Sequence, residues 1–586
     1  MLHTKSYHKG HPNPQKYREN YLSLDGEWDF LFDENDEGMM KEYYKEFPKK
    51  HLKIIVPYPY QSVASGINLP DKHVDVIWYH KSLCIEKFYK DARYLITFLA
   101  VDYQSILFVN GQRVFKHTGG YDSFTVDISK YLKEGDNHIV LRVVDEVRVD
   151  QIRGKQTWRD KTFECFYTDT SGIVLPVYLE IVDEQYIKYF SLKGDYLNKQ
   201  LKIHIESETH SKYTYYHVEV FRRGEDYPFV EETFKNNKHD LVINFDEVRP
   251  WSYDDPYLYD VRLSLYNDDL LADQIMTYFG FISFEAKESH IFVNNKDTYL
   301  KFVLDQGYFP NVITTPTEEQ IILDLNNIRE CGFNGLRKHE KIECPLFFYY
   351  ADTLGLYMWQ ECPSAHWYSY GSMLNYHTQL PRQIKDHFSH PCIMAYVIFN
   401  ESWGIQDLWR YKEMRENVDK LYDLVKSMSM DRFVISNDGW EHCKSDLLTF
   451  HNYAAYEKDL DKEIPSFEPL KRGENMKIAS WGKTMFASDE YHYEGQPILF
   501  TEFAGIAFDY SNQNREWGYG DKVHDEEGYL NRYASQLRYI KKMSDIRGFC
   551  MTQLTDVEIE KNGLYTFERK PKVDIEKIKE LHDQFK

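Results

Sequence analysis

The chain has 586 residues, 42% of them hydrophobic, and a formal net charge of −22 at pH 7. Such a length exceeds one ordinary domain and predicts about three or four domains. The negative charge argues against a nucleic-acid partner, because a phosphate backbone binds to cationic surfaces.

The eight cysteines are far apart and include no Cys-x-x-Cys pair, which predicts reduced thiols rather than a disulfide framework. Residues 1–20 contain no apolar segment typical of a secretory signal. No apolar run approaches the length of a membrane span. We therefore expect a cytoplasmic protein with no membrane partner.

The first half of the chain reads as two groups of β-strands. In residues 20–183, apolar runs are separated by turns, and Asn110-Gly111 between two such runs is typical of a β-hairpin. No amphipathic helix interrupts these runs, which favours a β-sandwich. Residues 184–281 contain a second group of alternating strands, long enough for an immunoglobulin-like sandwich.

The pattern changes to alternating strands and helices after residue 281. Thr317 to Gln320 resembles a capping box that opens a helix, and Gly332 ends it. Eight strands are expected, most of them followed by a helix, at 299–307, 333–339, 356–361, 392–400, 432–438, 447–453, 497–503 and 548–554. This order predicts a (β/α)8 barrel.

Two glutamates follow apolar strands of this barrel, Glu401 in IFNESWG and Glu502 in PILFTEFAG. They end the fourth and seventh strands, and the carboxyl ends of barrel strands share one mouth. Glycoside cleavage requires two such carboxyl groups, one protonated and one ionised. Asn400 offers an amide for a sugar 2-hydroxyl, and Trp403 offers a flat apolar surface. The alternative is two solvated strand ends, with Asn400 as a cap and Trp403 in the core.

Several motifs then resemble glycoside hydrolase family 2, which contains β-galactosidases, β-glucuronidases and β-mannosidases. They are FNESWG, FTEFAG, FNGLRKH, LYMWQECPSA and GKQTWRD…YTDTSGIVLPVYLE. The resemblance extends from roughly residue 20 to residue 570. It implies a jelly-roll sugar-binding domain over 1–183, an immunoglobulin-like β-sandwich over 184–281 and a catalytic TIM barrel over 282–586.

The resemblance also implies roles for the two glutamates. Glu401 would be the general acid/base and Glu502 the nucleophile of a retaining double displacement, which removes a terminal β-linked hexopyranosyl residue. A retaining mechanism predicts carboxyl groups about 5–5.5 Å apart, whereas inversion requires about 6.5–9.5 Å. We expect a small carbohydrate or glycoconjugate substrate, no cofactor, no metal and a homo-oligomer. A catalytically silent carbohydrate-binding relative and a transglycosylase are the alternatives.

Strand-end positions nominate the residues that would bind the sugar. They are Asn400, Arg337, His339, Asp305, His451, Tyr453, Trp440 and Gln553. The same reasoning places six others at the mouth, namely Lys338, Glu361, Asn437, Asp438, Asn452 and Asp556.

The cationic stretch LRKHEK bears on the identity of the sugar. A uronate carboxylate favours a cationic cluster with a bidentate arginine, for which Arg337 is the candidate. The alternative is that Lys338 and Lys341 are solvated and Arg337 supports the barrel. The Asn-x-Lys-Gly signature of the glucuronidase branch is absent from residues 560–572. The leading prediction is a β-D-galacturonide, followed by a β-D-galactoside and then a β-glucuronide.

Two departures from the family pattern concern the substrate. Gln553 stands where a tryptophan is often found, and Phe166 stands where many relatives have an acidic residue, which leaves Glu164 or Asp169 as substitutes. Two possible metal sites have little support in the sequence. His387 and His390 have helical spacing but no nearby partners, and Glu361 lacks a convincing set of magnesium ligands.

Overall fold

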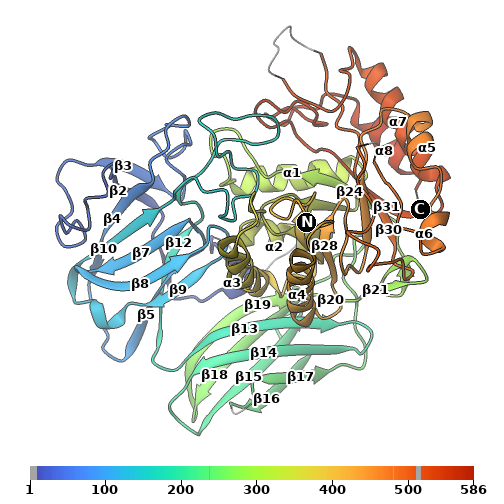
Figure 1. Cartoon of the computed structure of the whole chain (residues 1–586). Helices are drawn as coiled ribbons and strands as arrows, with labels where there is room; N and C mark the ends of the chain where they lie inside the picture. The colour runs from blue at the N-terminus through green and yellow to red at the C-terminus, as the bar shows by residue number, and fades with distance from the viewer. Residues whose placement is uncertain (1–9, 237, 480, 510–515, 586) are drawn as a thin grey trace.

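The computed structural model describes residues 10–236, 238–479, 481–509 and 516–585. Its N-terminal part is an antiparallel sandwich of two main sheets, drawn in blue in Figure 1. One sheet contains β1 (Tyr21–Ser23), β12 (Val177–Asp183), β5 (Ala92–Phe98) and β9 (Phe124–Asp127). The other contains β3 (Leu52–Val56), β2 (Gly26–Phe32), β4 (Val76–Ile85), β10 (Gly135–Val144), β7 (Gln104–Val109) and β8 (Gln112–Thr118).

The hairpin predicted at Asn110-Gly111 joins β7 to β8 and is confirmed. Both turn residues have positive φ, 49° and 78°. These values suit a tight turn that matches the twist of the strands, and Asn and Gly accept them at the lowest cost.

The second sandwich lies below the first in Figure 1. One sheet contains β17 (Asp240–Asn244), β14 (Gln200–Glu208), β13 (Tyr186–Asp195) and β20 (Phe281–Ile282). The other contains β16 (Val230–Lys235), β15 (Thr214–Arg222), β18 (Tyr259–Asn267) and β19 (Leu270–Phe279). The apolar residues of the alternating strands meet between the two sheets, with Ile203, Val218 and Leu263 among them.

The C-terminal part is one eight-stranded parallel sheet with helices between most of its strands. The strands are β24 (Leu300–Asp305), β25 (Gly335–Lys338), β26 (Tyr357–Glu361), β27 (Ile393–Asn400), β28 (Phe433–Asp438), β29 (Leu448–His451), β30 (Ile498–Glu502) and β31 (Ile546–Met551). The helices are α1 (Glu318–Glu330), α2 (Pro345–Leu354), α3 (Tyr370–His387), α4 (Lys412–Ser429), α5 (Glu457–Glu463), α6 (Glu468–Lys471), α7 (Glu526–Lys542) and α8 (Ile575–His582).

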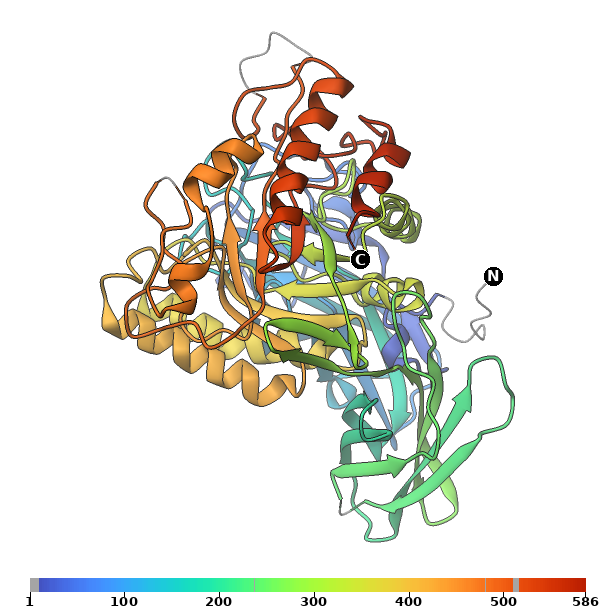
Figure 2. The ribbon, with the colours of Figure 1, turned by 90° about the vertical axis from the view of Figure 1, so that its right-hand side faces the viewer.

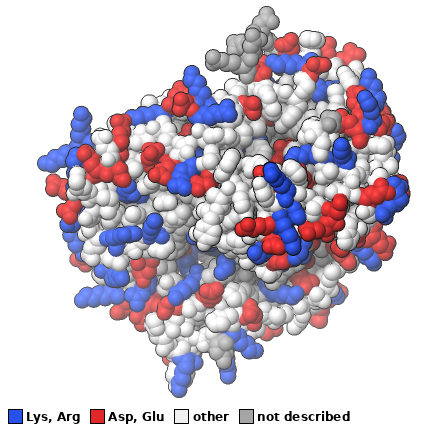
Figure 3. Space-filling view, viewed as in Figure 1, with Lys and Arg blue, Asp and Glu red and all other residues white. Residues whose placement is uncertain are grey.

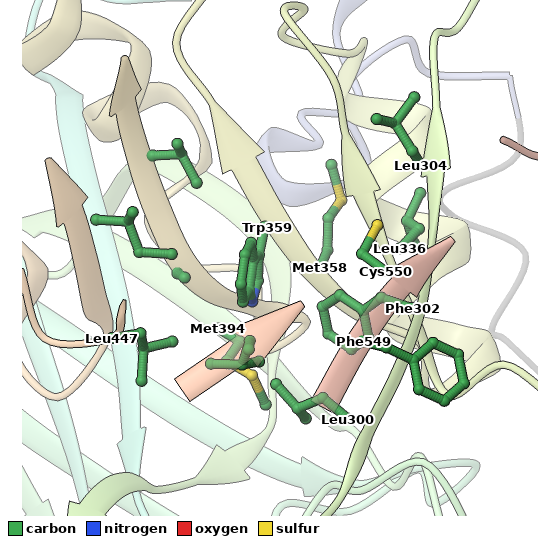
Figure 4. Close-up of a cluster of buried hydrophobic side chains, with 14 of the residues drawn as sticks. Leu300, Phe302, Leu304, Leu336, Met358, Trp359, Met394, Leu447, Phe549 and Cys550 are labelled. Carbon is green, nitrogen blue, oxygen red and sulfur yellow. The ribbon is translucent and has the colours of Figure 1, made fainter. Parts of the chain in front are cut away.

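The sheet closes into a barrel. β24 pairs with both β25 and β31, and the His451 N–H donates to the Gly439 carbonyl over 3.3 Å, which links β29 to the end of β28. Figure 4 shows buried side chains from several of these strands packed together, including Leu300, Phe302, Leu336, Met358, Met394 and Phe549. A packed barrel interior leaves the carboxyl ends of the strands as the place for a site.

Local sequence signals explain the first two barrel helices. Thr317 and Gln320 form the predicted capping box of α1, because each side-chain oxygen accepts from the backbone N–H of the other residue. Gly355 ends α2 in the left-handed conformation, with φ 77°. Among the described residues, every consecutive pair of barrel strands from β24 to β31 has an α-helix between its members, except β28 and β29.

Both sandwiches pack against the barrel, as the two ribbon views show (Figures 1 and 2). Ser123 of the first sandwich donates to Asp386 of α3 from its N–H over 2.7 Å and from its hydroxyl over 2.8 Å. In the second sandwich, Lys193 forms a 2.6 Å ion pair with Asp431. Charged contacts thus connect both sandwiches to the barrel.

No helix in the described part of the chain is long and apolar enough to cross a membrane. All eight cysteines are free thiols, as predicted. On the face seen in Figure 3, cationic and anionic side chains are interspersed.

Candidate active site

Glu401 and Glu502 lie at neighbouring positions in the barrel mouth. Glu502 is the last residue of β30, and Glu401 directly follows β27. The Glu401 N–H donates to the Asp438 carbonyl over 2.9 Å, and its φ of 52° turns the chain sharply after the strand. One carboxylate oxygen of each glutamate and one nitrogen of His451 all lie within 4.8 Å of one another. Strand counting therefore identified two residues that the fold brings together.

Glu502 is buried among groups that favour its ionised form. One oxygen accepts from Arg337 over 2.9 Å, and the other accepts from the Tyr453 hydroxyl over 2.6 Å. Burial alone would raise the pKa of Glu502, but the nearby charges of His451 and Arg337 lower this pKa to about 2. An ionised carboxylate held this way can attack an electrophilic carbon.

Glu401 has a different environment. Its side chain is 20% exposed, against 5% for Glu502, and its carboxylate lies 2.8 Å from Nδ1 of His451. Its carboxylate forms no ion pair with an arginine or lysine of the described chain. A carboxyl group that solvent reaches is accessible to a leaving group and to an incoming water molecule, as a general acid/base must be.

Arg337 of β25 holds several of these groups in place. Its Nε lies 2.7 Å from Glu361, and one terminal nitrogen lies 2.6 Å from Asp438 as well as 2.9 Å from Glu502. The other terminal nitrogen donates to Asn400 over 2.7 Å and contacts His339 over 3.1 Å. Each nitrogen of the guanidinium is therefore directed at a protein group.

His451 of β29 connects the two glutamates. Its Nδ1 faces Glu401 at 2.8 Å and Glu502 at 3.6 Å, while Nε2 contacts Asp438 at 2.9 Å. Burial would lower the pKa of His451, but the carboxylates of Glu502 and Asp438 raise it to about 10. A metal ion needs a neutral imidazole nitrogen. The spacing of these three ligand atoms would admit a metal, and in this structure both nitrogens of His451 are directed at carboxylates.

Other nominated residues also reach this centre. Tyr453 stacks on Tyr519, with ring centroids 3.4 Å apart. Trp440 meets the His451 ring edge-on at 5.6 Å. Burial lowers the pKa of His339, which contacts Glu361 over 3.1 Å. These side chains surround the two glutamates with aromatic faces and hydrogen-bonding groups.

Some nominated residues contact other parts of the chain. Asp305 forms a 2.6 Å ion pair with Lys338, and both are fully buried. Asn452 and Asp556 contact Glu463 and Lys572, respectively. Gln553 is buried and hydrogen-bonded to Gln306 and Asn562. These side-chain contacts are with residues other than Glu401 and Glu502.

The alternative interpretation of LRKHEK, with solvated lysines, is wrong. Lys338 is 0% exposed and Lys341 is 6% exposed, and both are paired with Glu343, at 3.0 Å and 2.8 Å. Burying an ammonium is costly, and the carboxylate of Glu343 offsets that cost for both lysines. The sequence around position 343 offers that carboxylate, but its pairing depends on the fold.

Three family models cover the chain. The sugar binding domain of the glycosyl hydrolases family 2 matches residues 21–173, the model described as glycosyl hydrolases family 2 matches residues 185–281, and the TIM barrel domain of that family matches residues 284–586. The chain belongs to glycosyl hydrolase family 2. The three predicted architectures, a jelly roll, an immunoglobulin-like sandwich and a TIM barrel, are confirmed.

Relatives carry two different names. A putative beta-glucuronidase of Formosa agariphila is 24% identical over 73% of this chain and 54% of its own length. A beta-galactosidase of Streptococcus thermophilus is 25% identical over 58% of this chain and 35% of its own length. The chain thus spans about half of the first relative and about a third of the second.

Solved structures share the whole architecture. A Ruminococcus gnavus beta-glucuronidase has a TM-score of 0.79 and 16% identity, with 98% of this chain and 100% of that chain covered. The same enzyme in complex with uronic isofagomine also has a TM-score of 0.79. At this identity the likeness shows the fold alone.

Sequence reasoning missed one charged residue at the mouth of this family 2 barrel. Lys155 comes from the jelly-roll domain and lies 4.7 Å above the Trp403 ring. Phe166, at the position of the expected acid, packs against Trp403 with ring centroids 5.2 Å apart. The motif GKQTWRD contains Lys155, but its spacing from the barrel strands gives no sign that it reaches them.

Proposed function

We propose that this chain is a retaining, exo-acting β-glycoside hydrolase. Glu502 attacks the anomeric carbon and forms a covalent glycosyl-enzyme, while Glu401 protonates the departing oxygen. Glu401 then deprotonates the water that releases the sugar. The observation that carries this proposal is the distance between the two carboxyl groups, with one oxygen of each within 4.8 Å. So close an approach of the two carboxyl groups favours retention, for which they stand about 5–5.5 Å apart, over inversion, for which they stand about 6.5–9.5 Å apart.

The environments of the two glutamates support this division of roles. Arg337 and Tyr453 keep Glu502 ionised, as a nucleophile requires. Glu401 is more exposed and is bound by a histidine rather than by an arginine. Asn400, whose carbonyl oxygen accepts from Arg337, is held beside Glu401 for contact with the sugar 2-hydroxyl.

The leading substrate is a β-hexuronide, with a β-D-galacturonide ahead of a β-D-galactoside and a β-glucuronide. Arg337, the cation first assigned to the uronate carboxylate, directs its N–H groups at protein acceptors. A uronide therefore requires another cation in the mouth. The names of the relatives include both glucuronidases and galactosidases, so they support a β-glycoside without selecting the sugar.

Two measurements test this proposal. A panel of nitrophenyl β-glycosides with galactoside, galacturonide, glucuronide, glucoside, mannoside and fucoside identifies the sugar. Proton NMR during hydrolysis of the preferred substrate then reports the first anomer released. We expect the β-anomer to appear first and to mutarotate later. Initial release of the α-anomer would contradict retention, and no turnover of any member would favour a catalytically silent carbohydrate-binding protein.

A further inference from the structure

A segment of the jelly-roll domain, residues 145–171, lies against the barrel mouth. The Arg153 and Gly154 N–H groups both donate to the Ser364 carbonyl, over 3.1 Å and 3.0 Å. Gly154 has a φ of 60°, and a Cβ on it would lie 2.1 Å from the Glu340 carbonyl oxygen. Only glycine permits such an approach, so the segment is fixed directly before Lys155.

Lys155 is 6% exposed and faces the groups of the mouth. Its ammonium lies 4.7 Å from the ring centroid of Trp403 and 5.8 Å from that of Phe166. Among the described residues, no carboxylate oxygen lies within 4.0 Å of this ammonium. The Cys165 thiol lies near this ammonium and is at most a weak acceptor.

Three carboxylates lie farther away and have their own partners. Glu502 is bound by Arg337 and Tyr453. Glu560 accepts from Tyr167 and from Asn562, and Glu340 accepts from Ser364. Burial would lower the pKa of Lys155, but Cys165 and the carboxylates of Glu560 and Glu502 raise it. The ammonium therefore remains charged while it lacks a direct counter-ion.

A buried charge without a counter-ion is costly, and in a binding site the ligand can supply the missing partner. We propose that Lys155 binds the carboxylate of a β-hexuronide and so determines the preference for uronides over neutral sugars. Trp403 follows Glu401 by two residues, so the Lys155 ammonium over the Trp403 ring borders the mouth that holds the two glutamates. A sugar ring held between the two glutamates therefore lies next to this ammonium. This inference rests on the proposed glycosidase function.

Phe166 provides an apolar wall beside Lys155. The Phe166 ring packs beside the ammonium, with its centroid 5.8 Å away. An apolar ring cannot bind a sugar hydroxyl, but it strengthens the attraction between Lys155 and an anionic group by excluding water. Lys155 and Phe166 thus both favour the binding of a uronate carboxylate.

The test compares sugars that differ only at C6. Values of kcat/KM are measured for nitrophenyl β-galacturonide against β-galactoside and for β-glucuronide against β-glucoside. For Lys155→Met, we expect kcat/KM on the preferred uronide to fall by about 30-fold or more, while the neutral partner changes far less. Lys155→Arg keeps the charge and should retain most of the preference for the uronide.

Lys193→Met is the control, because Lys193 is also buried but pairs with Asp431 outside the mouth. Its uronide-to-neutral ratio should equal that of the wild type.

Three results would overturn the inference. The first is a wild-type enzyme that cleaves β-glycosides but prefers the neutral member of each pair. The second is an equal loss on both members in Lys155→Met, because a positioning role affects both sugars alike. The third is a wild-type enzyme with no activity on any β-glycoside. This last result would contradict the proposed function as well, whereas the first two leave retaining hydrolysis intact. Thermal melting of each variant confirms that it is folded.

Discussion

Arg337 and Lys338 are neighbours on β25, and both side chains are fully buried, yet they belong to different charge networks. Arg337 points into the barrel and meets carboxylates from three other strands, Glu361, Asp438 and Glu502. Lys338 points outward, pairs with Asp305 and Glu343, and lies 4.0 Å from the Phe347 ring of α2. The alternation of side chains along a strand separates the two networks.

The difference between these networks is access rather than charge. The inner network contains Glu502 and borders Glu401, which is 20% exposed, so a substrate can reach it. In the outer network, Asp305, Lys338 and Glu343 are at most 1% exposed, and Lys341 is 6% exposed. We infer that the inner network performs chemistry and the outer network holds β24 and β25 to the loops that follow them.

We expect the largest effect on kcat when the nucleophile is removed. Glu502→Gln should lower kcat by at least about 10³-fold on every substrate, because an amide cannot form the glycosyl-enzyme. Glu343→Gln places the same substitution in the outer network and should keep the activity per folded molecule. Comparable losses in the two variants would remove the distinction between the networks.

The next effect depends on the leaving group. Glu401→Ala should slow the cleavage of a poorly leaving alkyl glycoside by about 10²–10⁴-fold, because that reaction needs a proton donor. A dinitrophenyl glycoside leaves without protonation, so its glycosylation step should be far less affected. Added azide should restore turnover of this substrate and give a β-glycosyl azide. Equal losses on both substrates would show that Glu401 is not the general acid.

In the outer network we expect a loss of stability instead of activity. Lys338→Met leaves Asp305 buried without its ion-pair partner, which should lower the free energy of unfolding by about 3–5 kcal/mol. The double variant with Asp305→Asn should recover part of this loss. Denaturant unfolding measures the stability, and kcat of the folded fraction should stay near that of the wild type. A loss of kcat without a loss of stability would place Lys338 in the catalytic network.

The smallest effect is on the pH dependence of stability. His451 has a folded pKa of about 10, above its ordinary value of 6.5. Its stabilising contribution is therefore complete below pH 6.5 and is lost as the pH rises toward 10. The melting temperature of the wild type should fall more over this interval than that of His451→Gln. Parallel curves would show that His451 does not carry a stabilising proton.

Sequence reasoning found the residues whose position follows from strand order. The strands ending at Asn400 and Glu502 were evident from their apolar runs, and the barrel rule then placed Glu401 and Glu502 in one mouth. The helix from Glu318 was evident from its capping box. These features depend on local patterns or on one general rule of the fold.

Contacts between distant segments could not be predicted in the same way. Asp305 and Arg337 both stand near strand ends, but only the register shows that Asp305 pairs with Lys338. Lys155 reaches the mouth because Gly154 packs against the Glu340 carbonyl, in another domain. Neither the Asp305–Lys338 ion pair nor the approach of Gly154 to Glu340 is signalled by a periodic pattern in the sequence.

The assignment of Glu502 as the nucleophile can be tested most directly by trapping the intermediate. A 2-deoxy-2-fluoro β-glycoside of the preferred sugar, with a good leaving group, slows release of the glycosyl-enzyme enough for mass spectrometry of its peptides. We predict that the sugar is attached to Glu502 and that Glu502→Gln forms no adduct. Attachment to Glu401 or to another carboxylate, or turnover without any covalent adduct, would contradict the assignment.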